Sequence, residues 1–292
     1  MYKVLVIIFF ISFLPLSVYA QSIKIKSVVY SKESYTPLSF ANIGIVNKFT
    51  ATITNEKGYF EIEVAATDTL VFSMVGYQTL KVVAGQCRDE VLMEAQNFQL
   101  PEIVIQPGKF TNIEIGFHRG RQTGKYIGCP QLAVFINNPV KIEGIVQKVH
   151  FWMGWENPAF DWQILKVRIR VYKRDSVSGL PSTDILTQQI MVDIAREKVY
   201  KKHIEIDLKN YHILFPDEGA FIGLDLIGFI DTQGSFIKYM DRRQHLYISS
   251  TEVFPDIYTY TYALGQWQKG SSGRYRGLNN ARFGVEVKFP AQ

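Results

Sequence analysis

Apolar and polar residues alternate in short runs along most of the chain, and this period of two predicts β-strands. In one such run, Phe60, Ile62 and Val64 form an apolar face, and the residues between them are polar or amphipathic. The turn before this run ends at Gly58, where a tight hairpin commonly requires a positive φ. Roughly seven short strands of this kind, separated by regular turns, predict a small β-sandwich over residues 21–97.

The remaining chain repeats the pattern on a larger scale. Residues 98–112 contain a Pro-Gly break and are predicted to be a linker. The nearly continuous apolar run 221–230 is typical of a central strand, and residues 184–189 have the composition of one helical turn. No sustained helical pattern follows. Residues 113–292 are therefore predicted to form a second, jelly-roll-like β-sandwich, so the fold class is all-β with two sandwich domains.

Several short motifs in the first domain occur in an order that resembles the carboxypeptidase-regulatory-like, or transthyretin-like, domain family. They cover nearly all of that domain. The motifs are Pro37-Leu38, Phe40-Ala41-Asn42-Ile43, Thr54-Asn55-Glu56-Lys57-Gly58-Tyr59-Phe60, Asp68-Thr69-Leu70 and Phe72-Ser73-Met74-Val75-Gly76-Tyr77.

The resemblance implies a Greek-key, immunoglobulin-like sandwich without an active site. In that family the domain commonly precedes the plug of TonB-dependent outer-membrane receptors of Gram-negative bacteria, and it also fronts other exported proteins. The segment Leu100–Ile105 resembles the strand that follows the domain in those receptors. The chain then departs from the receptor pattern, because about 180 further residues are too few for a receptor-sized transmembrane barrel.

Charge adds little to this picture. Of 292 residues 20% are charged and the net charge is +5, with acidic residues spread among basic ones, so no concentrated basic face for nucleic acid is expected. The nearest candidate is Lys166, Arg168 and Arg170, which alternate with apolar residues and are followed by Lys173 and Arg174. We expect these side chains to form the solvated face of a half-buried sheet.

Residues 1–20 have the pattern of a secretory signal peptide. Lys3 supplies the positive charge, an apolar run follows from Val4 to Leu14, and Ala20 ends a small-residue cleavage site before Gln21. No later segment is long and apolar enough to cross a bilayer as a helix. The mature chain is thus expected in the periplasm or associated with the outer membrane or cell surface, either soluble or peripherally attached.

Two cysteines, Cys87 and Cys129, allow one disulfide, which would join the two domains. Export permits such a bond. Two separate free thiols are an equally simple alternative.

No motif with catalytic chemistry stands out. None of the five histidines has a Glu three residues on, so the zinc site of a carboxypeptidase is not expected. His203 and Glu205 share a strand face and could hold a metal, although a solvated pair is the simpler interpretation. A nucleophile elbow and a phosphate-binding glycine loop are both missing, and Asp225 and Asp231 do not define a carboxylate pair. We predict no enzyme activity, no cofactor and no metal.

Two aromatic clusters are candidate binding surfaces. In the first, Trp155 lies between Trp152 and Trp162. The alternative for this cluster is that Trp152 and Trp162 belong to the core. In the second cluster, a stripe of tyrosines alternates with threonines, and cross-strand packing is the alternative for it. The candidate binding residues are Tyr258, Tyr260, Tyr262, Trp267 and Trp155.

The sequence therefore predicts a non-catalytic exported envelope protein that binds a protein or a glycan. A structural or assembly subunit of an outer-membrane complex, joined through edge strands, is the alternative. An unrecognised hydrolase is a third hypothesis, because active sites can be assembled from residues distant in sequence.

Overall fold

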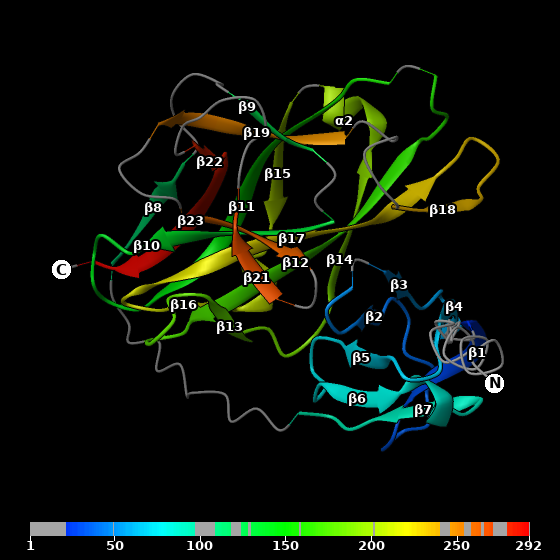
Figure 1. Ribbon diagram of the computed structural model, residues 1–292. Helices are drawn as coiled ribbons and strands as arrows, with labels where there is room; N and C mark the ends of the chain where they lie inside the picture. The colour runs from blue at the N-terminus through cyan, green and yellow to red at the C-terminus, as the bar shows by residue number, and fades with distance from the viewer. Residues whose placement is uncertain are drawn as a thin grey trace, which may run out of the picture.

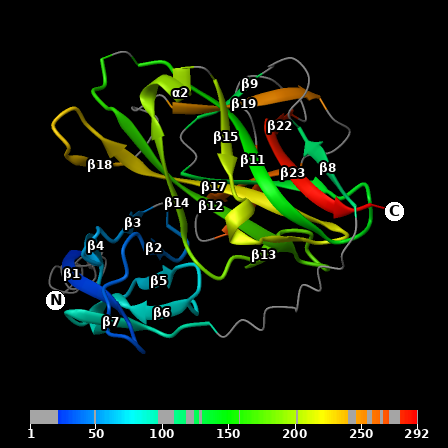
Figure 2. The ribbon, with the colours of Figure 1, turned by 180° about the vertical axis from the view of Figure 1, so that it is seen from behind.

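The computed structural model of the chain is nearly all β, which confirms the predicted fold class. Two domains built of β-strands follow one another along the chain (Figures 1 and 2). In both views the first packs against the part of the second that carries β13 and β14. The structure describes residues 22–48, 50–96, 109–117, 124–127, 130–157, 159–200, 202–239, 246–253, 258–263, 266–270 and 279–291. The predicted signal peptide and most of the predicted linker lie outside these residues.

The first domain is a sandwich of a three-stranded sheet, in the order β4-β1-β7, and a four-stranded sheet, in the order β3-β2-β5-β6. Strands β1 and β4 are antiparallel, whereas β7 pairs with β1 in parallel. Its elements are β1 (Ser22–Ser31), β2 (Asn42–Ile45), β3 (Ala51–Ile53), β4 (Tyr59–Ala65), β5 (Thr69–Ser73), β6 (Leu80–Val83), the 3-10 helix η1 (Ala84–Gln86) and β7 (Glu90–Met93).

Strict alternation in β4 builds the core of this domain. Phe60, Ile62 and Val64 are buried, and the residues between them are exposed, as the sequence predicts. The inward side chains of both sheets join in one cluster, in which Phe60 meets Phe72 edge-on with ring centroids 5.6 Å apart. Because each sheet alone would expose an apolar face, this packing is what holds the two sheets together.

The hairpin before β4 confirms the predicted requirement for glycine. Gly58 has φ +72°, and the Asn55 side chain caps the turn by accepting the backbone N–H groups of Lys57 and Tyr59. A Cβ atom on Gly58 would lie 2.7 Å from the Val29 carbonyl oxygen. Backbone conformation and space therefore both exclude a side chain here.

We expect Gly58→Ala to lower the free energy of unfolding by roughly 1–3 kcal/mol, the usual cost of a strained backbone position. Chemical denaturation of the purified chain measures this loss. Gly44→Ala is the matched control, because a Cβ on Gly44 of β2 meets no atom within 4 Å and its φ is not positive. An equal loss in both variants would contradict the assigned role of Gly58.

The second domain is larger. Its strands are β8 (Phe110–Gly116), β9 (Gly124–Ile127), β10 (Gln131–Asn137), β11 (Gly144–Trp155), β12 (Ile164–Arg174), β13 (Pro181–Asp184), β14 (Ile190–Ala195), β15 (His203–Asp207), β16 (Leu214–Phe215), β17 (Gly219–Ile230), β18 (Phe236–Lys238), β19 (Leu246–Val253), β20 (Thr259–Ala263), β21 (Gln266–Lys269), β22 (Asn279–Ala281) and β23 (Phe283–Pro290). Its helices are α2 (Arg196–Tyr200) and the 3-10 helix η2 (Lys209–Tyr211). The helical turn predicted at 184–189 is wrong, because residue 184 still belongs to a strand, and β8 starts inside the stretch assigned to the linker.

Two eight-stranded sheets face each other in this domain. One has the order β13-β12-β17-β10-β20-β21, with β14 on β12 and β18 on β17. The other has the order β22-β19-β11-β23-β8, with β15 and β16 on β11 and β9 on β19. Apolar side chains of both sheets form the main core, which includes Val167 of β12, Ile222 of β17 and Phe151 of β11. The jelly-roll assignment of the second domain stays a prediction.

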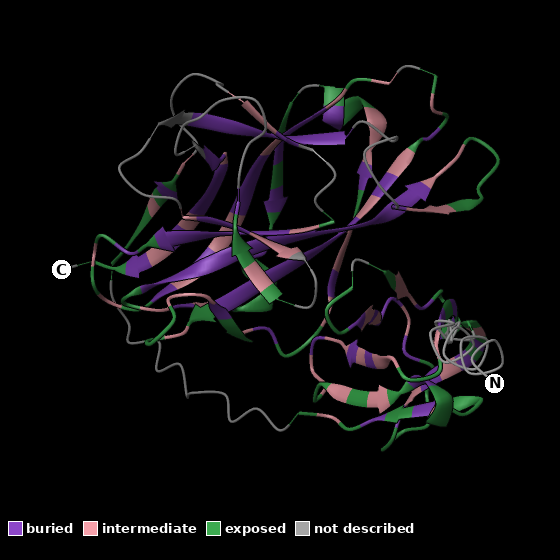
Figure 3. Cartoon of the chain, in the orientation of Figure 1, coloured by how far each residue is buried: buried purple, intermediate pink, exposed green. Residues whose placement is uncertain are grey.

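The central strand β17 is buried on both faces, as Figure 3 shows by its colour. Ile222 and Leu224 point into the main core, whereas Phe221 joins a second cluster with Phe135 and Tyr260 on the outer face of the same sheet. Asp225 also lies on the outer face, because successive side chains of a strand alternate between faces. Something other than solvent must therefore cover this outer face.

Candidate functional site

The first domain covers part of that outer face, and Arg168 of β12 makes the central contact. Its guanidinium is fully buried, with 0% of the side chain exposed. Nη1 donates to the Phe40 carbonyl oxygen at 2.7 Å, and Nη2 donates to Oδ1 of Asn42 at 2.8 Å. Gln189 strengthens the contact, since its side chain accepts from Arg168 and donates to the Ser39 carbonyl oxygen. The prediction that Arg168 belongs to a solvated face is wrong. Strand parity shows that its side chain points to the outer side of the sheet, but not what packs on that side.

Two carboxylates balance the buried cations. Nε of Arg168 donates to Oδ2 of Asp225 at 2.9 Å, and Nη1 of Arg170 lies 3.3 Å from the same oxygen. Nε of Arg170 also donates to Oδ2 of Asp184 at 2.5 Å. The group of two arginines and two aspartates is therefore neutral as a whole. Burial lowers the pKa of Arg168 and raises the pKa of Asp184, although the Arg170 charge opposes the shift of Asp184.

A loop of the first domain inserts into the second domain. Val75 is buried within the main core of the second domain rather than in its own. The next residue, Gly76, has φ +85°, and a Cβ there would lie 3.0 Å from the Thr187 carbonyl oxygen. Tyr77 turns back and packs on the core of the first domain. The insertion of this loop thus adds an apolar contact between the two domains.

Further contacts join β18 to the first domain. Nζ of Lys238 donates to Oγ1 of Thr52 at 2.7 Å and to the Ala51 carbonyl oxygen at 3.3 Å. Burial lowers the pKa of Lys238 to about 8. The ring of Phe236 lies 6.0 Å from that of Phe40, whose φ of +60° is unusual for a bulky residue. The interface therefore holds a strained residue of the first domain in place.

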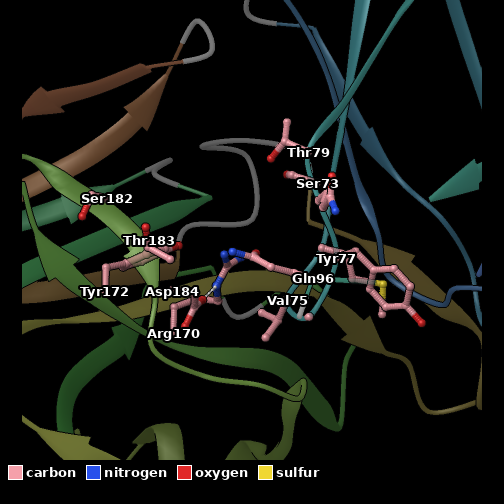
Figure 4. Close-up of a pocket in the computed structure, with 13 residues that line it drawn as sticks. Ser73, Val75, Tyr77, Thr79, Gln96, Arg170, Tyr172, Ser182, Thr183 and Asp184 are labelled. Carbon is pink, nitrogen blue, oxygen red and sulfur yellow. Dashed lines mark hydrogen bonds and ion pairs between the residues drawn. The ribbon is translucent and has the colours of Figure 1, made fainter. Parts of the chain in front are cut away.

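A cleft of about 790 Å³ opens beside these contacts, between the two domains. Figure 4 shows that one wall comes from the second domain and the other from the first. Strands β12 and β13 supply one wall, and the end of β5, the loop after it and Gln96 in the segment after β7 supply the other. The lining residues are Ser73, Met74, Val75, Gly76, Tyr77, Gln78, Thr79, Gln96, Arg170, Tyr172, Ser182, Thr183 and Asp184.

The second-domain wall continues into an aromatic surface. The phenol oxygen of Tyr172 accepts a hydrogen bond from Nε2 of Gln131 at 2.7 Å, and burial raises the pKa of Tyr172. Its ring meets Trp267 edge-on with centroids 5.4 Å apart, and Trp267 meets Tyr262 in the same way at 5.3 Å. Both outer rings are half-buried. A half-exposed aromatic strip therefore borders the cleft.

Comparison with family models assigns the first domain. Residues 25–105 match the model of the CarboxypepD_reg-like domain. The first domain is a CarboxypepD_reg-like domain. This confirms the resemblance found in the sequence, and a domain of this kind is non-catalytic. No curated protein matches the chain. In the described part of the chain, no helix has the length and apolar character needed to span a bilayer.

The motifs that identify the CarboxypepD_reg-like domain also supply several of its contacts with the second domain. Phe40 and Asn42 receive the Arg168 hydrogen bonds, while Val75 and Gly76 form the inserted loop. The folding role of these motifs is visible in the sequence. Their docking role is not, because it depends on which surface of the second domain faces them.

The predicted binding tyrosines have three different environments. Tyr260 is buried with 8% exposed and packs edge-on against Phe221, so its interpretation as an exposed binding ring is wrong. Tyr258 is half-buried and stacks on Phe117 with centroids 5.6 Å apart. Tyr262 belongs to the strip beside the cleft. Cross-strand packing explains Tyr260, and a binding role for Tyr258 and Tyr262 stays a prediction.

The predicted tryptophan cluster divides in the same way. Trp162 is fully buried in the main core. Trp155 is half-buried and meets both Trp162 and Phe229 edge-on, so it borders the core and does not line the cleft. Trp152 is not a core residue, because it stacks on His203 of the neighbouring strand β15, with centroids 4.4 Å apart.

The histidine and glutamate pair on β15 lies beside a second histidine. Nδ1 of His150 lies 3.3 Å from Nε2 of His203 and 3.8 Å from Oε2 of Glu205. Among the described residues, no group of three or more potential ligands is arranged to hold a metal ion. His118 and His245 lie outside these residues.

Cys87 and Asp231 have simple environments. Cys87 is a half-buried free thiol whose pKa is raised by burial, and Cys129 lies outside the described residues. Asp231 caps the turn between β17 and β18 by accepting the backbone N–H groups of Gln233 and Ser235. Asp225, by contrast, lies in the buried charge group.

Sequence reasoning missed the cleft residues Arg170, Tyr172 and Asp184. One signal was present, because Asp225 interrupts an otherwise apolar central strand. A buried carboxylate requires a cation nearby, and the arginines of the adjacent strand are the natural partners. That signal would have indicated a buried ionic contact, although not the domain that covers it.

Proposed function

We propose that this chain is an exported, non-catalytic binding protein of the bacterial envelope, with its ligand site in the cleft between the CarboxypepD_reg-like domain and the second domain. The observation that carries the proposal is a cleft lined by both domains beside a fully buried Arg168 contact. Ligand sites commonly occur at domain interfaces and have volumes of roughly 300–1,000 Å³. Export rests on the signal pattern of residues 1–20.

Rigid walls favour binding. A site that is formed before the ligand arrives avoids the entropy cost of ordering it. Arg168 and the inserted Val75 loop fix the two walls relative to each other. The cleft therefore has the properties of a preformed binding site.

The chemistry of the cleft supports binding rather than catalysis. Its two ionisable partners, Arg170 and Asp184, are joined to each other. The hydroxyl of Ser182 donates to the Lys173 carbonyl oxygen instead of to a base. A nucleophile with its proton acceptor, the minimum for covalent hydrolysis, is not found among the described lining residues.

A cleft-filling substitution tests the proposal. Thr183 is exposed on the cleft wall, so Thr183→Trp should block the site without disturbing the core. Thr111→Trp is the matched control, because Thr111 is an exposed strand threonine of the same domain outside the cleft. The mature chain, starting at Gln21, is used for capture from a detergent-solubilised native envelope and for a glycan array.

We expect the parent chain and Thr111→Trp to capture the same protein or glycan, and Thr183→Trp to lose it while remaining folded by circular dichroism. Equal capture by both variants would place the binding surface outside the cleft. Co-purification with a large complex that Thr183→Trp leaves intact would favour the assembly subunit instead. If no variant captures a protein or a glycan, the binding proposal fails.

A further inference from the structure

The charges along the cleft cancel one another. Arg170 and Asp184 are the charged residues among its lining side chains, and they form an ion pair. Behind them, Arg168 and Asp225 add one further charge of each sign. An ionic ligand would leave one charge of the site or of the ligand without a partner in a partly desolvated place, which is unfavourable. The site is therefore matched to a ligand without net charge.

The other polar groups of the cleft are neutral and available. Apart from Ser182 and Tyr172, they are hydroxyl and amide side chains that make no hydrogen bond within the described part of the chain. Hydroxyls and amides each both donate and accept hydrogen bonds. They suit a ligand whose own groups do the same at many positions. These side chains are Ser73, Gln78, Thr79, Gln96 and Thr183.

The aromatic strip extends this surface on one side. Trp267 touches Tyr172 at the cleft wall, and Tyr262 touches Trp267. Aromatic faces and edges offer apolar contact beside polar groups. Sugars combine apolar C–H faces with rings of hydroxyls, so a chain of sugar residues could occupy the cleft and continue along the strip.

From the neutral charge balance, the available hydroxyl and amide groups and the adjoining strip, we infer that the cleft binds a neutral oligosaccharide segment. This inference rests on the proposed function and names the ligand class of that same site. An extended peptide is the competing ligand class, because β13, which lines the cleft, is the outermost strand of its sheet, and the uncharged decapeptides below test it.

Titration calorimetry with defined probes tests the inference. The probes are neutral pentasaccharides of glucose, mannose, galactose and N-acetylglucosamine, uronic-acid oligomers of the same length, and uncharged decapeptides. The mature parent chain is compared with Gln96→Glu, which adds an unbalanced charge to the cleft with little change in size. Gln163→Glu is the control, since Gln163 is exposed and lies outside the cleft.

We expect at least one neutral pentasaccharide to bind and the uronic-acid oligomers to bind more weakly. Gln96→Glu should weaken binding roughly tenfold, the value of about one net hydrogen bond, and Gln163→Glu should not change it. Thr183→Trp should abolish binding.

Three results would overturn the inference. They are stronger binding of the uronic-acid oligomers or decapeptides, binding that Thr183→Trp leaves unchanged, and failure of every neutral pentasaccharide to bind. Capture of a protein partner that Thr183→Trp abolishes, together with failure of the sugars, would retain the cleft as a binding site and reject only the ligand class. If the parent chain binds none of the probes and captures no protein, both the oligosaccharide inference and the proposed function are rejected.

Discussion

Replacing Arg168 with alanine should lower the free energy of unfolding by roughly 3–5 kcal/mol, the usual cost of breaking a buried ion pair from one side. The substitution leaves the Phe40 carbonyl, Asn42 and Asp225 without the donor that now satisfies them. Oδ1 of Asp225 already has no hydrogen-bond partner within the described residues. Chemical denaturation measures the loss, and faster hydrogen exchange at residues 38–42 would report separation of the two domains.

Lys166→Ala is the matched control for this prediction. Lys166 lies two residues earlier on the same face of β12, and it pairs with the exposed Asp193 at 3.0 Å. Exposed pairs contribute about 1 kcal/mol or less. Truncation of Arg168 should thus lower the free energy of unfolding strongly, and truncation of Lys166 should lower it little, although the two residues alternate with apolar residues in the same way. Equal losses in the two variants would mean that Arg168 does not hold the interface together.

Replacing Trp162 with alanine should have a comparable effect, a loss of roughly 3–5 kcal/mol, because truncation of a fully buried aromatic leaves a cavity. Its ring meets Trp155 and Phe229 edge-on, so their packing would loosen as well. Thermal and chemical denaturation with a near-ultraviolet circular dichroism spectrum measure the change in stability and in aromatic packing.

Trp162→Phe distinguishes the effect of side-chain volume on stability from the effect of the buried polar N–H group. The indole N–H of Trp162 is buried and has no hydrogen-bond partner in the described part of the chain. Removing that group offsets part of the cost of the smaller ring, so this variant should lose clearly less than the alanine variant. Trp152→Ala, on the outer face of the other sheet, should cost about 1 kcal/mol. A larger loss at Trp152 than at Trp162 would contradict the assignment of Trp162 to the core.

The interface explains why a folding motif can also position one wall of the cleft. Phe40 at φ +60° and Gly76 at φ +85° are local features of the CarboxypepD_reg-like domain, yet both lie where the second domain packs. Residues held in rare backbone conformations persist when surrounding contacts determine them. Here those contacts come from Arg168 and the chain around Thr187. The same contacts fix the first-domain wall of the cleft.

Strand alternation was sufficient to predict much of the fold. The pattern of Phe60, Ile62 and Val64 predicted the inner face of β4, and Gly58 marked the turn before it. The apolar run in β17 indicated a central strand. These predictions succeed because side-chain direction in a strand depends on local geometry alone. The motif order in residues 25–105 was likewise sufficient to indicate the family of the first domain.

The candidate site could not be found in the same way. Arg168 and Lys166 have the same parity on one strand, but the first domain covers Arg168, whereas Lys166 keeps 17% of its side chain exposed and pairs with Asp193. Tyr260 and Tyr262 also share a parity, yet one is buried and the other borders the cleft. Parity states which face of a sheet a side chain occupies, and only the packing of one domain on another decides whether that face meets water, a core or a ligand site. By itself, then, the sequence determined the strands, the all-β class and the identity of the first domain, which depend on local geometry and motif order. The tertiary structure alone decided the buried charge group, the inserted loop and the cleft, because these depend on contacts between separate strands and between the two domains, such as that of Phe40 with Arg168.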